Sequence, residues 1–438
     1  MSRPAGTPAL PAVSPLSAVA LLPGSVETPA YVYDLAEVRA NADRLLTALP
    51  GNRDLYYSLK ANPHPAVLRT LRAAGARPEV CSPGELEAAL EAGWSAGTVL
   101  YTGPGKRDRD VAAALAAGVR EFSVDSPTAL DQLDRLCAEQ GVRARCLVRV
   151  NDDQPVPGQA LVMTGVPSPF GADADWIREE PALFANRPHT EIIGLHLYMG
   201  TNLGTVEALL AQFTRAAQTF RDLAQVLRGE GVELRVLDLG GGFGAPFATA
   251  GEPLDLTGLA RPLAAMLDAE LPGWRSDAPR LAFESGRYLV GTAGTLLTTV
   301  LDAKRSQGKE IVVLDCGINH LGGMSGLRRL PPLTPHLDTA ARPAEAEAEA
   351  EAEGEETVET MVCGPLCTPL DTWDRRARLP RLVPGDRLTV PNVGAYGLYA
   401  SLVAFLGHPL PVEAAVDTDR PGEAPVHLSR VALVRGSH

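Results

Sequence analysis

Short apolar runs rich in β-branched residues alternate with apolar stripes at helical spacing between about residues 50 and 290. Each short run predicts a buried strand, and each stripe predicts a helix. The predicted strands cover residues 54–59, 78–82, 98–103, 120–126, 143–151, 191–198, 233–240 and 280–285, with helices at 64–74, 84–92, 111–117, 129–139 and 206–228. Eight strands that alternate with helices predict an α/β fold with a closed parallel (β/α)8 barrel. An open doubly wound sheet is the alternative, because the strand count could be off by one.

The pattern changes after about residue 290, where the helical stripes fade and β-rich runs appear at 294–301, 310–315, 387–391 and 426–434. A further strand is predicted at 28–33, before the barrel begins. We therefore expect a second, mostly-β domain that is built from both ends of the chain. The expected parts are a leader with a joining strand (1–35), the barrel (36–288) and the C-terminal β domain (289–438).

The charge of the chain is concentrated in one segment. The net charge is −13 over 438 residues, but residues 343–359 alone carry eight Glu and no Lys or Arg. The alternating Ala and Glu of this segment could form a helix, but it would have no apolar face to bury, so we predict a solvated surface insertion. The remainder is mildly acidic without a basic stripe, which argues against a nucleic-acid partner.

Other features of the composition point to a cytoplasmic protein. No apolar run approaches the length of a membrane span, and prolines interrupt the apolar patch of the leader, which argues against a secretory signal. The six cysteines form no disulfide framework, and Cys363 and Cys367 lack the second pair that a zinc site needs. We therefore expect a reducing compartment and no metal site.

Polar residues fall repeatedly at the ends of the predicted barrel strands. These residues are Lys60, Glu79, Ser82, Arg149, Asn151, His196, Gly240, Gly241, Gly242, Glu284 and Arg287. Chemistry in parallel barrels collects at the carboxyl ends of the strands. Their coincidence at that end predicts an active site at the barrel mouth.

Lys60 and a glycine cluster suggest the kind of chemistry. A lysine at the end of a strand is by itself more often a surface residue. In a partly desolvated mouth, however, its amine is expected to lose proton affinity and to become a nucleophile toward an aldehyde. The amides of Gly240, Gly241 and Gly242 can approach a phosphate, although a tight turn explains the glycines about as well. Their position after the seventh strand favours phosphate.

Three more side chains suit a planar ring. His196 could stack on one face of the ring, although a lone histidine is more often a core or surface residue. Glu284 could keep a ring nitrogen protonated, although a lone glutamate is more often a capping or surface residue. Arg287 could hold a substrate carboxylate or pair with a nearby acid. Together with Lys60 and the glycines they predict pyridoxal 5'-phosphate (PLP), whereas the glycine spacing argues against a dinucleotide.

Seven motifs resemble those of the barrel-type (fold type III) PLP-dependent decarboxylases, which include the diaminopimelate, ornithine and arginine decarboxylases. They are YYSLKANP (56–63), EVCSPGEL (79–86), LVRVN (147–151), LDLGGGFG (237–244), FESGR (283–287), VCGPLCTPLD (362–371) and GAYG (394–397). The resemblance spans residues 30–411 and implies an alanine racemase-like fold in which Lys60 forms the Schiff base. The cofactor contacts it implies come from Glu79, Ser82, Arg149, His196, Thr201, Gly240, Gly241, Gly242, Glu284 and Tyr396.

The resemblance also implies a head-to-tail homodimer with shared active sites, in which Cys367 reaches the partner's site. The predicted catalytic residues are then Lys60, His196 and Cys367, the last to orient the substrate or protonate the carbanion. The predicted substrate contacts are Arg287, Arg328, Thr368 and Asp371. Three departures bear on the substrate. Thr368 replaces the Glu usual in diaminopimelate decarboxylases, and HLYMGTN (196–202) has extra residues before Thr201. After Gly317, GGMSGLRRLPP (322–332) stands in place of the family's Arg-x-x-x-Tyr segment.

We therefore expect a PLP-dependent carboxy-lyase that acts on a free or conjugated amino acid other than diaminopimelate. The departures resemble decarboxylases of amino acids joined to a carrier protein or a siderophore precursor. The alternatives are a diaminopimelate decarboxylase of lysine biosynthesis, an amino-acid racemase, and a cofactor-binding protein without catalysis. The motifs around Cys367 and Tyr396 favour decarboxylation over racemisation, and the second domain argues against a small cofactor carrier.

Overall fold

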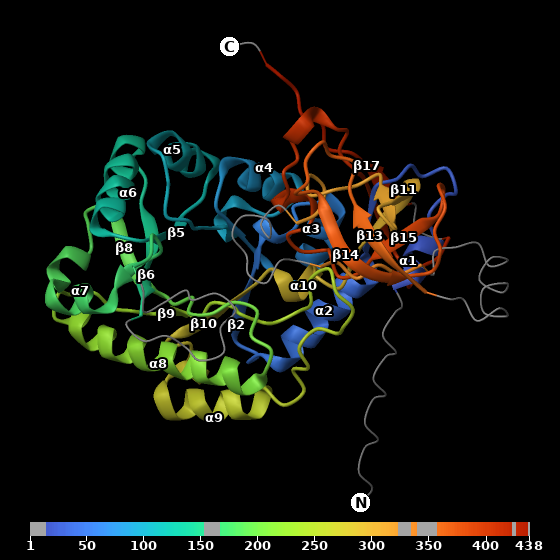
Figure 1. Ribbon diagram of the computed structural model, residues 1–438. Coiled ribbons are helices and arrows are strands. Elements are labelled where there is room, and N and C mark those ends of the chain that lie inside the picture. Colours follow the sequence, from blue (N-terminus) through green and yellow to red (C-terminus); the bar gives the residue numbers. More distant parts are fainter. Residues whose placement is uncertain (1–14, 153–166, 323–333, 340–356, 423–425, 437–438) are drawn as a thin grey trace, which may run out of the picture.

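The computed structural model describes residues 15–152, 167–322, 334–339, 357–422 and 426–436. Most of the predicted leader, Arg328 and residues 343–356 of the predicted Ala/Glu insertion lie outside the described residues. The described chain forms a barrel of strands covered by helices, beside a mostly-β domain (Figure 1). None of the helices in these segments has the length and hydropathy of a membrane span.

The first part is a closed ring of parallel strands, as the sequence pattern predicted. Within the described residues the ring has eight strands: β2 (Arg53–Ser58), β3 (Arg77–Val80), β4 (Leu100–Tyr101), β5 (Glu121–Val124), β6 (Ala144–Asn151), β8 (Thr190–His196), β9 (Val236–Asp238) and β10 (Arg280–Ser285). Strand β10 pairs in parallel with β2, and β5 with β6, which closes the ring and excludes the open sheet. Strands β4 and β9 are shorter than predicted. The two-residue strand β7 (Ala172–Asp173) pairs in parallel with the end of β6 and lies outside the ring.

Several of the helices that follow the strands start at residues whose side chains cap them. The helices are α3 (Pro65–Ala73), α4 (Pro83–Glu91), α5 (Asp108–Ala117), α6 (Pro127–Gln140), α7 (Ala174–Glu179), α8 (Val206–Arg228) and α9 (Ala260–Glu270), of which α7 and α9 were not predicted. The side chains of Ser82 and Ser126 accept hydrogen bonds from the first turns of α4 and α6, and a proline follows each serine. Such caps satisfy free amides and fix where a helix begins.

The amino-terminal end of the barrel is closed by charged groups that satisfy one another. Glu121 accepts from Arg77 at 3.0 Å and from Arg145 at 2.9 Å, and the hydroxyl of Tyr56 lies 3.3 Å from the same carboxylate. Tyr56 also belongs to a cluster of buried apolar side chains from β2, β4, β6, β8, β9 and β10. This end is filled, so the carboxyl end of the strands is left for a site.

The second part is a sheet that combines both ends of the chain. Its strands are β14 (Thr372–Leu379), β13 (Val358–Cys363), β12 (Lys309–Leu314), β11 (Gly294–Ser306), β1 (Ala30–Asp34), β16 (Val412–Val416) and β17 (His427–Ser429) in spatial order, with β15 (Arg387–Val390) beside β11. Strand β1 lies between β11 and β16, antiparallel to the first and parallel to the second. The helices α2 (Leu35–Ala48) and α10 (Arg287–Val290) follow β1 and β10, and α1 (Pro15–Ala20) packs near β1 and β11.

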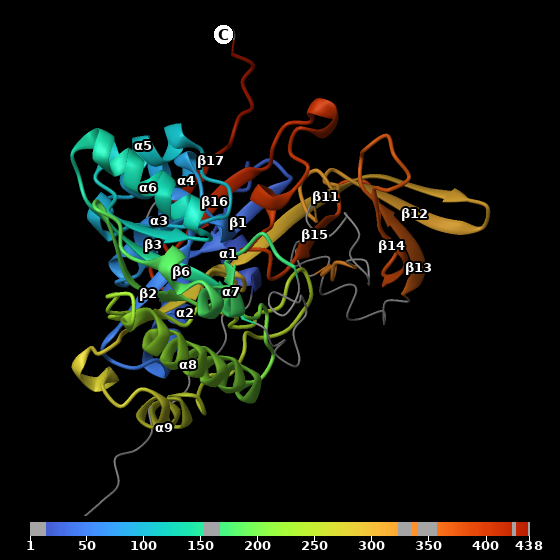
Figure 2. The ribbon, with the colours of Figure 1, turned by 90° about the vertical axis from the view of Figure 1, so that its left-hand side faces the viewer.

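Five of these strands correspond to predicted runs, whereas β13, β14 and β16 were not predicted. The last predicted run, 426–434, contains only the three-residue β17. Strands β11 and β12 form a hairpin that, with β13 and β14, projects away from the barrel (Figure 2). The division of the chain at residues 35 and 288 stays a prediction.

Candidate active site

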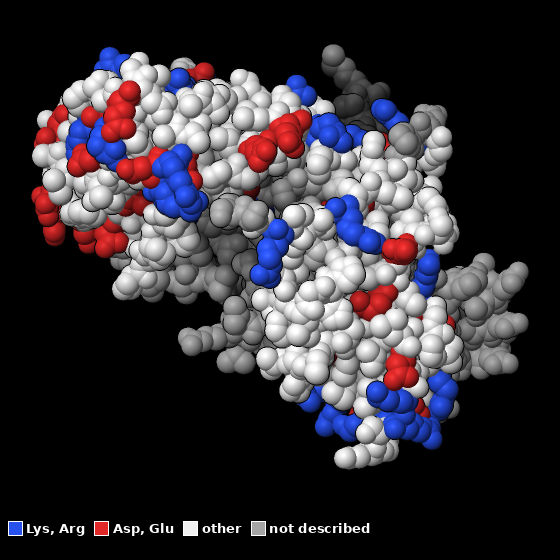
Figure 3. All heavy atoms as spheres, turned by 90° about the horizontal axis from the view of Figure 1, so that it is seen from above, with Lys and Arg blue, Asp and Glu red and all other residues white. Residues whose placement is uncertain are grey.

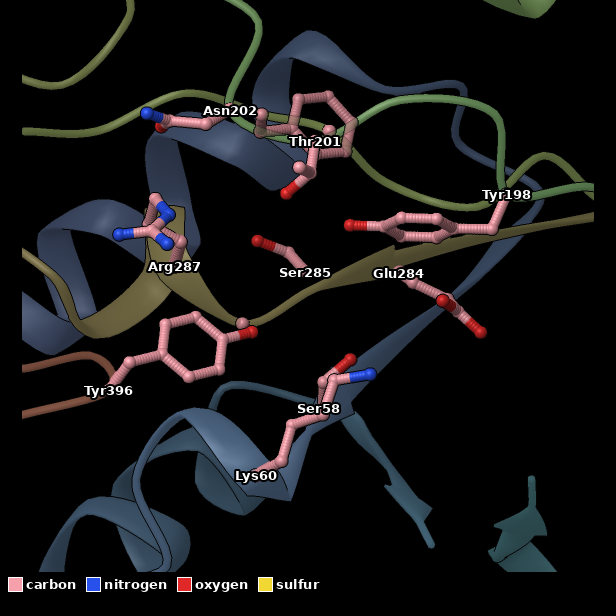
Figure 4. A pocket seen from close by; sticks show the side chains of 12 residues that line it. Ser58, Lys60, Tyr198, Thr201, Asn202, Glu284, Ser285, Arg287 and Tyr396 are labelled. Atoms are coloured by element: carbon pink, nitrogen blue, oxygen red, sulfur yellow. The ribbon is translucent and has the colours of Figure 1, made fainter. Parts of the chain in front are cut away.

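A pocket lies at the carboxyl end of the barrel strands. Its lining residues are Ser58, Lys60, Tyr198, Thr201, Asn202, Gly242, Phe243, Glu284, Ser285, Gly286, Arg287 and Tyr396. Figure 4 shows Arg287, Thr201 and Asn202 toward one end of the pocket and Lys60 with Glu284 toward the other.

Lys60 is held at the pocket by bonds between the barrel and the β domain. It lies in a single turn of 3-10 helix directly after β2. The amide of Tyr396 donates to the carbonyl of Ala61 at 2.8 Å, and the side-chain amide of Asn62 donates to the carbonyl of Gly394 at 2.9 Å. The motifs YYSLKANP and GAYG, far apart in sequence, therefore meet and fix each other.

The pKa of Lys60 is shifted in the direction opposite to the one predicted from the sequence. Glu79 raises the pKa of Lys60 well above its usual value, and this attraction outweighs the opposing effect of burial. The prediction that the amine loses proton affinity is therefore wrong, because a buried carboxylate in the mouth stabilises the ammonium form. Lys60 is exposed to the pocket as a cation.

Glu79 is fixed beside Lys60 by two hydroxyl groups. It is buried on β3, where Ser58 Oγ donates to one carboxylate oxygen and Thr102 Oγ1 donates to the other at 2.7 Å. Ser82, also predicted to contact the cofactor, has a different position: its hydroxyl caps α4 by accepting from the amide of Glu85 at 3.2 Å. Ser82 does not line the pocket, because its side chain is occupied by the helix.

The glycine bend after β9 is a place where backbone segments touch directly. Gly240 and Gly242 have left-handed φ of 68° and 100°, which favours glycine. A Cβ on Gly241 would collide with the carbonyl oxygen of Glu284. Gln212 of α8 holds the bend by donating to the carbonyl of Gly241 at 2.6 Å. Gly242 and Thr201 lie at the pocket itself.

Glu284 belongs to a buried cluster with His196 and Asp238. The Nε2 atom of His196 lies 3.2 Å from Oε1 of Glu284. Burial alone would raise the pKa of Glu284, but the neighbouring His196 lowers it below its usual value. Burial, reinforced by Glu284, raises the pKa of Asp238. Glu284 is therefore the ionised carboxylate of the cluster. The possible ligand atoms of the three residues lie within 4.8 Å of one another, so the cluster could also hold a cation.

His196 is not among the residues that line the pocket, and its stacking on a ring stays a prediction. It is 0% exposed at the end of β8. Its Nδ1 lies 3.0 Å from Oγ of Ser123, and its Nε2 faces Glu284, so the ring is enclosed below the mouth. Tyr198, two residues further along, lines the pocket instead. The sequence analysis missed Tyr198, although the two-residue period of a strand could have indicated it.

Arg149 does not line the pocket itself but lies between two aromatic rings, of which that of Tyr198 lines the pocket. Its guanidinium carbon is 4.9 Å from the ring centroid of Phe170 and 5.8 Å from that of Tyr198. The residue is 8% exposed. Arg287 has a similar neighbour, since its guanidinium carbon lies 5.0 Å from the ring of Tyr396.

The predicted residues after β13 lie apart from this pocket. Cys367 is exposed and Thr368 half-buried, and neither lines the pocket of its own chain. Asp371 is buried and accepts from the amides of Ile318 and Leu366, both at 2.9 Å. It therefore anchors the loop rather than presenting its carboxylate to a substrate, which corrects the prediction. Arg328 lies outside the described residues.

Comparison with known proteins identifies relatives along most of the chain. The family "Pyridoxal-dependent decarboxylase, pyridoxal binding domain" matches residues 35–291. The chain is 31% identical over 387 residues to the L-glutamyl-BtrI acyl-carrier protein decarboxylase of Niallia circulans, with 88% of each chain covered. It is 32% identical over 426 residues to the diaminopimelate decarboxylase of Methanothermobacter thermautotrophicus, with 94% of this chain and 92% of the relative covered.

A solved structure agrees with these relatives. Diaminopimelate decarboxylase from Helicobacter pylori, complexed with L-lysine, superposes with a TM-score of 0.77 at 25% identity. The superposition covers 93% of this chain and 95% of the other. The barrel with its second sheet is therefore the fold of the fold type III PLP enzymes. More particularly, the chain belongs to the pyridoxal-dependent decarboxylases related to the diaminopimelate and ornithine enzymes, and it is a carboxy-lyase with PLP as cofactor.

The described residues of the pocket carry the kinds of groups that are needed to bind PLP. Oγ of Ser285 is buried without a hydrogen-bond partner among the described residues, which suits a group that meets a ligand. The glycine bend offers backbone amides and Arg287 offers a charged donor for a phosphate. Lys60 reaches the same pocket with its amine, which suits an aldehyde.

Gly241→Ala tests whether the glycine bend holds the phosphate end of the cofactor. We expect the purified variant to retain about a tenth or less of the wild-type PLP and to lose about 1–3 kcal/mol of unfolding free energy, because the methyl group forces the bend and β10 apart. PLP content is measured after alkaline release, and stability by denaturant titration. Gly258→Ala is the matched control, because a Cβ there meets no atom within 4 Å. Full PLP content in Gly241→Ala would contradict this role.

Proposed function

We propose that this enzyme decarboxylates an amino acid other than free diaminopimelate, and that the amino acid is joined to a carrier. The observation that carries the proposal is Thr368, which follows Cys367 on the exposed loop after β13. A threonine has no charge with which to pair a distal ammonium group, which a glutamate at this position would supply. The relative from Niallia circulans, named for a glutamyl group on an acyl-carrier protein, supports a carrier-borne substrate.

The cofactor is proposed to lie with its phosphate toward Arg287, Thr201 and Gly242 and its ring toward Glu284. A guanidinium group beside the backbone amides of Gly241 and Gly242 suits a phosphate better than a single carboxylate, whereas the Gly240 amide already donates to Asp238. Arg287 is therefore reassigned from the substrate carboxylate to the phosphate. Ionised Glu284 would hold the ring nitrogen protonated, with His196 below it as the group that keeps Glu284 charged.

The chemistry then divides between cofactor and chain. When bound, PLP accepts the electron pair released as the bond from the amino acid's α-carbon to its carboxylate breaks. Lys60 supplies the amine that attaches the cofactor and gives way to the substrate amine. Glu79 favours the charged form of that amine by raising the pKa of Lys60, and we propose that it takes up the proton the amine must lose. Cys367 is proposed to return a proton to the α-carbon.

A basic surface on the β domain supports an acidic carrier as partner. The exposed cations are Lys304, Arg305, Lys309, Arg375, Arg376, Arg378 and Arg381, which lie on β11, β12, β14 and the segment after it. Figure 3 shows Lys and Arg gathered at that end of the molecule. Such a cluster on a chain of net charge −13 attracts negatively charged partners in a salt-dependent way.

A homodimer with shared sites is part of the proposal. Cys367 must reach a second pocket, since it does not line its own. Its loop carries Leu370, which is 77% exposed, and the chain after Tyr396 exposes Phe405 and Leu406 at 41% and 52%. Apolar groups exposed in this way are typical of surfaces that a partner covers.

A substrate panel tests the carrier proposal. Carbon dioxide release is measured with meso-diaminopimelate, with free ornithine, lysine, arginine and glutamate, and with amino acids attached to an acyl-carrier protein. We expect at least one carrier-bound amino acid to exceed diaminopimelate in kcat/KM by about tenfold or more, which is ~1.4 kcal/mol of transition-state stabilisation. The KM for the carrier-bound amino acid should rise with added salt, whereas the KM for a free amino acid should not.

Diaminopimelate as the best substrate would contradict the carrier proposal. Lys60→Ala is the control for the chemistry, because the substitution removes the amine without altering the loop of Thr368. The Lys60→Ala variant should lose the cofactor's absorption band and should release no carbon dioxide. Deuterium exchange at the α-carbon without release of carbon dioxide would instead indicate racemisation.

Subunit complementation tests the shared site. Lys60→Ala and Cys367→Ala chains, each with a different affinity tag, are co-expressed and the mixed dimer is isolated with both tags. If Cys367 acts in the partner's pocket, one of the two sites is intact, and about half of the wild-type activity is expected. If each pocket uses its own Cys367, the mixed dimer has no intact site and stays inactive.

A further inference from the structure

The three carbonyl groups of the glycine bend, residues 240–242, are each held by a different element. The amide of Glu284 donates to the first carbonyl and the amide of Leu203 donates to the third, both at 2.8 Å. The middle carbonyl, that of Gly241, accepts from Nε2 of Gln212 in α8 at 2.6 Å. Two of these donors belong to the backbone, so Gln212 is the one whose hydrogen bond a substitution can remove.

The burial of Gln212 is not explained by packing alone. The residue is 0% exposed. Its Oε1 atom is buried without a hydrogen-bond partner among the described residues. An unpaired polar atom in the interior costs free energy, which an apolar side chain of the same length would avoid. Within the described chain, the bond to Gly241 is the contact that requires an amide group at this position.

This bond decides which way the peptide group between Gly241 and Gly242 faces. The cis peptide bonds of the described chain precede Pro29 and Pro279, so this peptide is trans. In a trans peptide the C=O and the N–H point in opposite directions. A carbonyl held toward α8 therefore turns the N–H of Gly242 to the other side. Gly242 lines the pocket and Gln212 does not, so that other side is the side of the pocket.

The peptide needs a device of this kind because glycines flank it. Gly242 has a φ of 100°, and glycine adopts either sign of φ at little cost. Both amide atoms of Gln212 lie against the bend, since a Cβ on Gly242 would be 3.2 Å from Nε2 and 3.4 Å from Oε1. The next residue, Phe213, packs its ring on Phe243 and Phe283, with centroids 5.9 and 5.5 Å apart. Helix α8 is thereby fixed beside the bend.

We infer that Gln212 is a positioning residue, which holds the Gly241–Gly242 peptide so that the N–H of Gly242 faces the phosphate of PLP. It acts through the backbone and does not itself line the pocket. A hydrogen bond to an ionised phosphate is stronger than one between neutral groups, and a donor oriented before binding lowers the cost of binding. The inference rests on the proposed position of the phosphate beside Arg287, Thr201 and Gly242.

Titration of the full-length apoenzyme with PLP, and with pyridoxal, which lacks the phosphate, tests this role. Gln212→Met keeps the length of the side chain and removes the donor. We expect the Kd of PLP to rise about tenfold, the size of one hydrogen bond to a charged group, and the Kd of pyridoxal to stay near that of wild type. The phosphorus NMR signal of bound PLP should shift. The midpoint of denaturant unfolding of the apoenzyme should not change, because one unpaired oxygen is exchanged for another.

Two further variants complete the comparison. Gln218→Met is the matched control, because Gln218 also lies on α8, donates to Glu270 at 3.0 Å and does not line the pocket. It should leave both Kd values unchanged. Arg287→Met tests the position of the phosphate itself, and it should weaken the binding of PLP much more than that of pyridoxal.

The inference is overturned if Gln212→Met binds PLP as tightly as wild type. It is also overturned if the variant weakens PLP and pyridoxal to the same extent, since the glutamine would then support the pocket in general rather than the phosphate. Gln212→Leu, which also has no donor, gives the same comparison if the Met variant does not fold. Equal effects of Arg287→Met on the two compounds would contradict the proposed position of the phosphate, and with it the inference.

Discussion

The attraction between Lys60 and Glu79 is the interaction on which the site depends. A lysine at a barrel mouth would ordinarily extend into solvent, and burial alone would favour its neutral form. Glu79, fixed by Ser58 and Thr102, instead favours the charged form of the amine by raising the pKa of Lys60. The same barrel end holds a second buried carboxylate, Glu284, which is balanced by a histidine. The carboxyl end of the barrel therefore holds two buried acids with different partners.

The fold brings these groups together by contacts between backbone segments. Residues of the Lys60 turn bond to the loop that carries Tyr396, although more than three hundred residues separate them. Glycines occur where a Cβ would collide: a Cβ on Gly394 would strike the carbonyl oxygen of Val290, and one on Gly286 would lie 2.9 Å from Cβ of Ala61. The pocket is thus a joint between barrel and β domain, and neither part forms it alone.

The sequence predicted the barrel because periodicity and strand ends are local properties. Lys60, Glu284 and Gly242 were predicted as site residues because each lies at the end of a predicted strand. Tyr198, which lines the pocket, was missed because only His196 was singled out on this strand, although alternation sends both side chains to the same face. The pKa of Lys60 was missed because Glu79 comes from the neighbouring strand. Strand β14 was overlooked although Trp373, Ala377 and Leu379 alternate with exposed arginines, because the basic residues concealed its period.

The account rests on a covalent link between Lys60 and the cofactor, and peptide mapping after borohydride reduction tests it most directly. Reduction fixes a lysine-bound pyridoxyl group, so digestion and mass spectrometry locate it. The account predicts a single pyridoxyl group, on the peptide that contains Lys60. A pyridoxyl group on Lys106, whose side chain is 7% exposed and 3.6 Å from Asp125, or on no lysine at all, would contradict it.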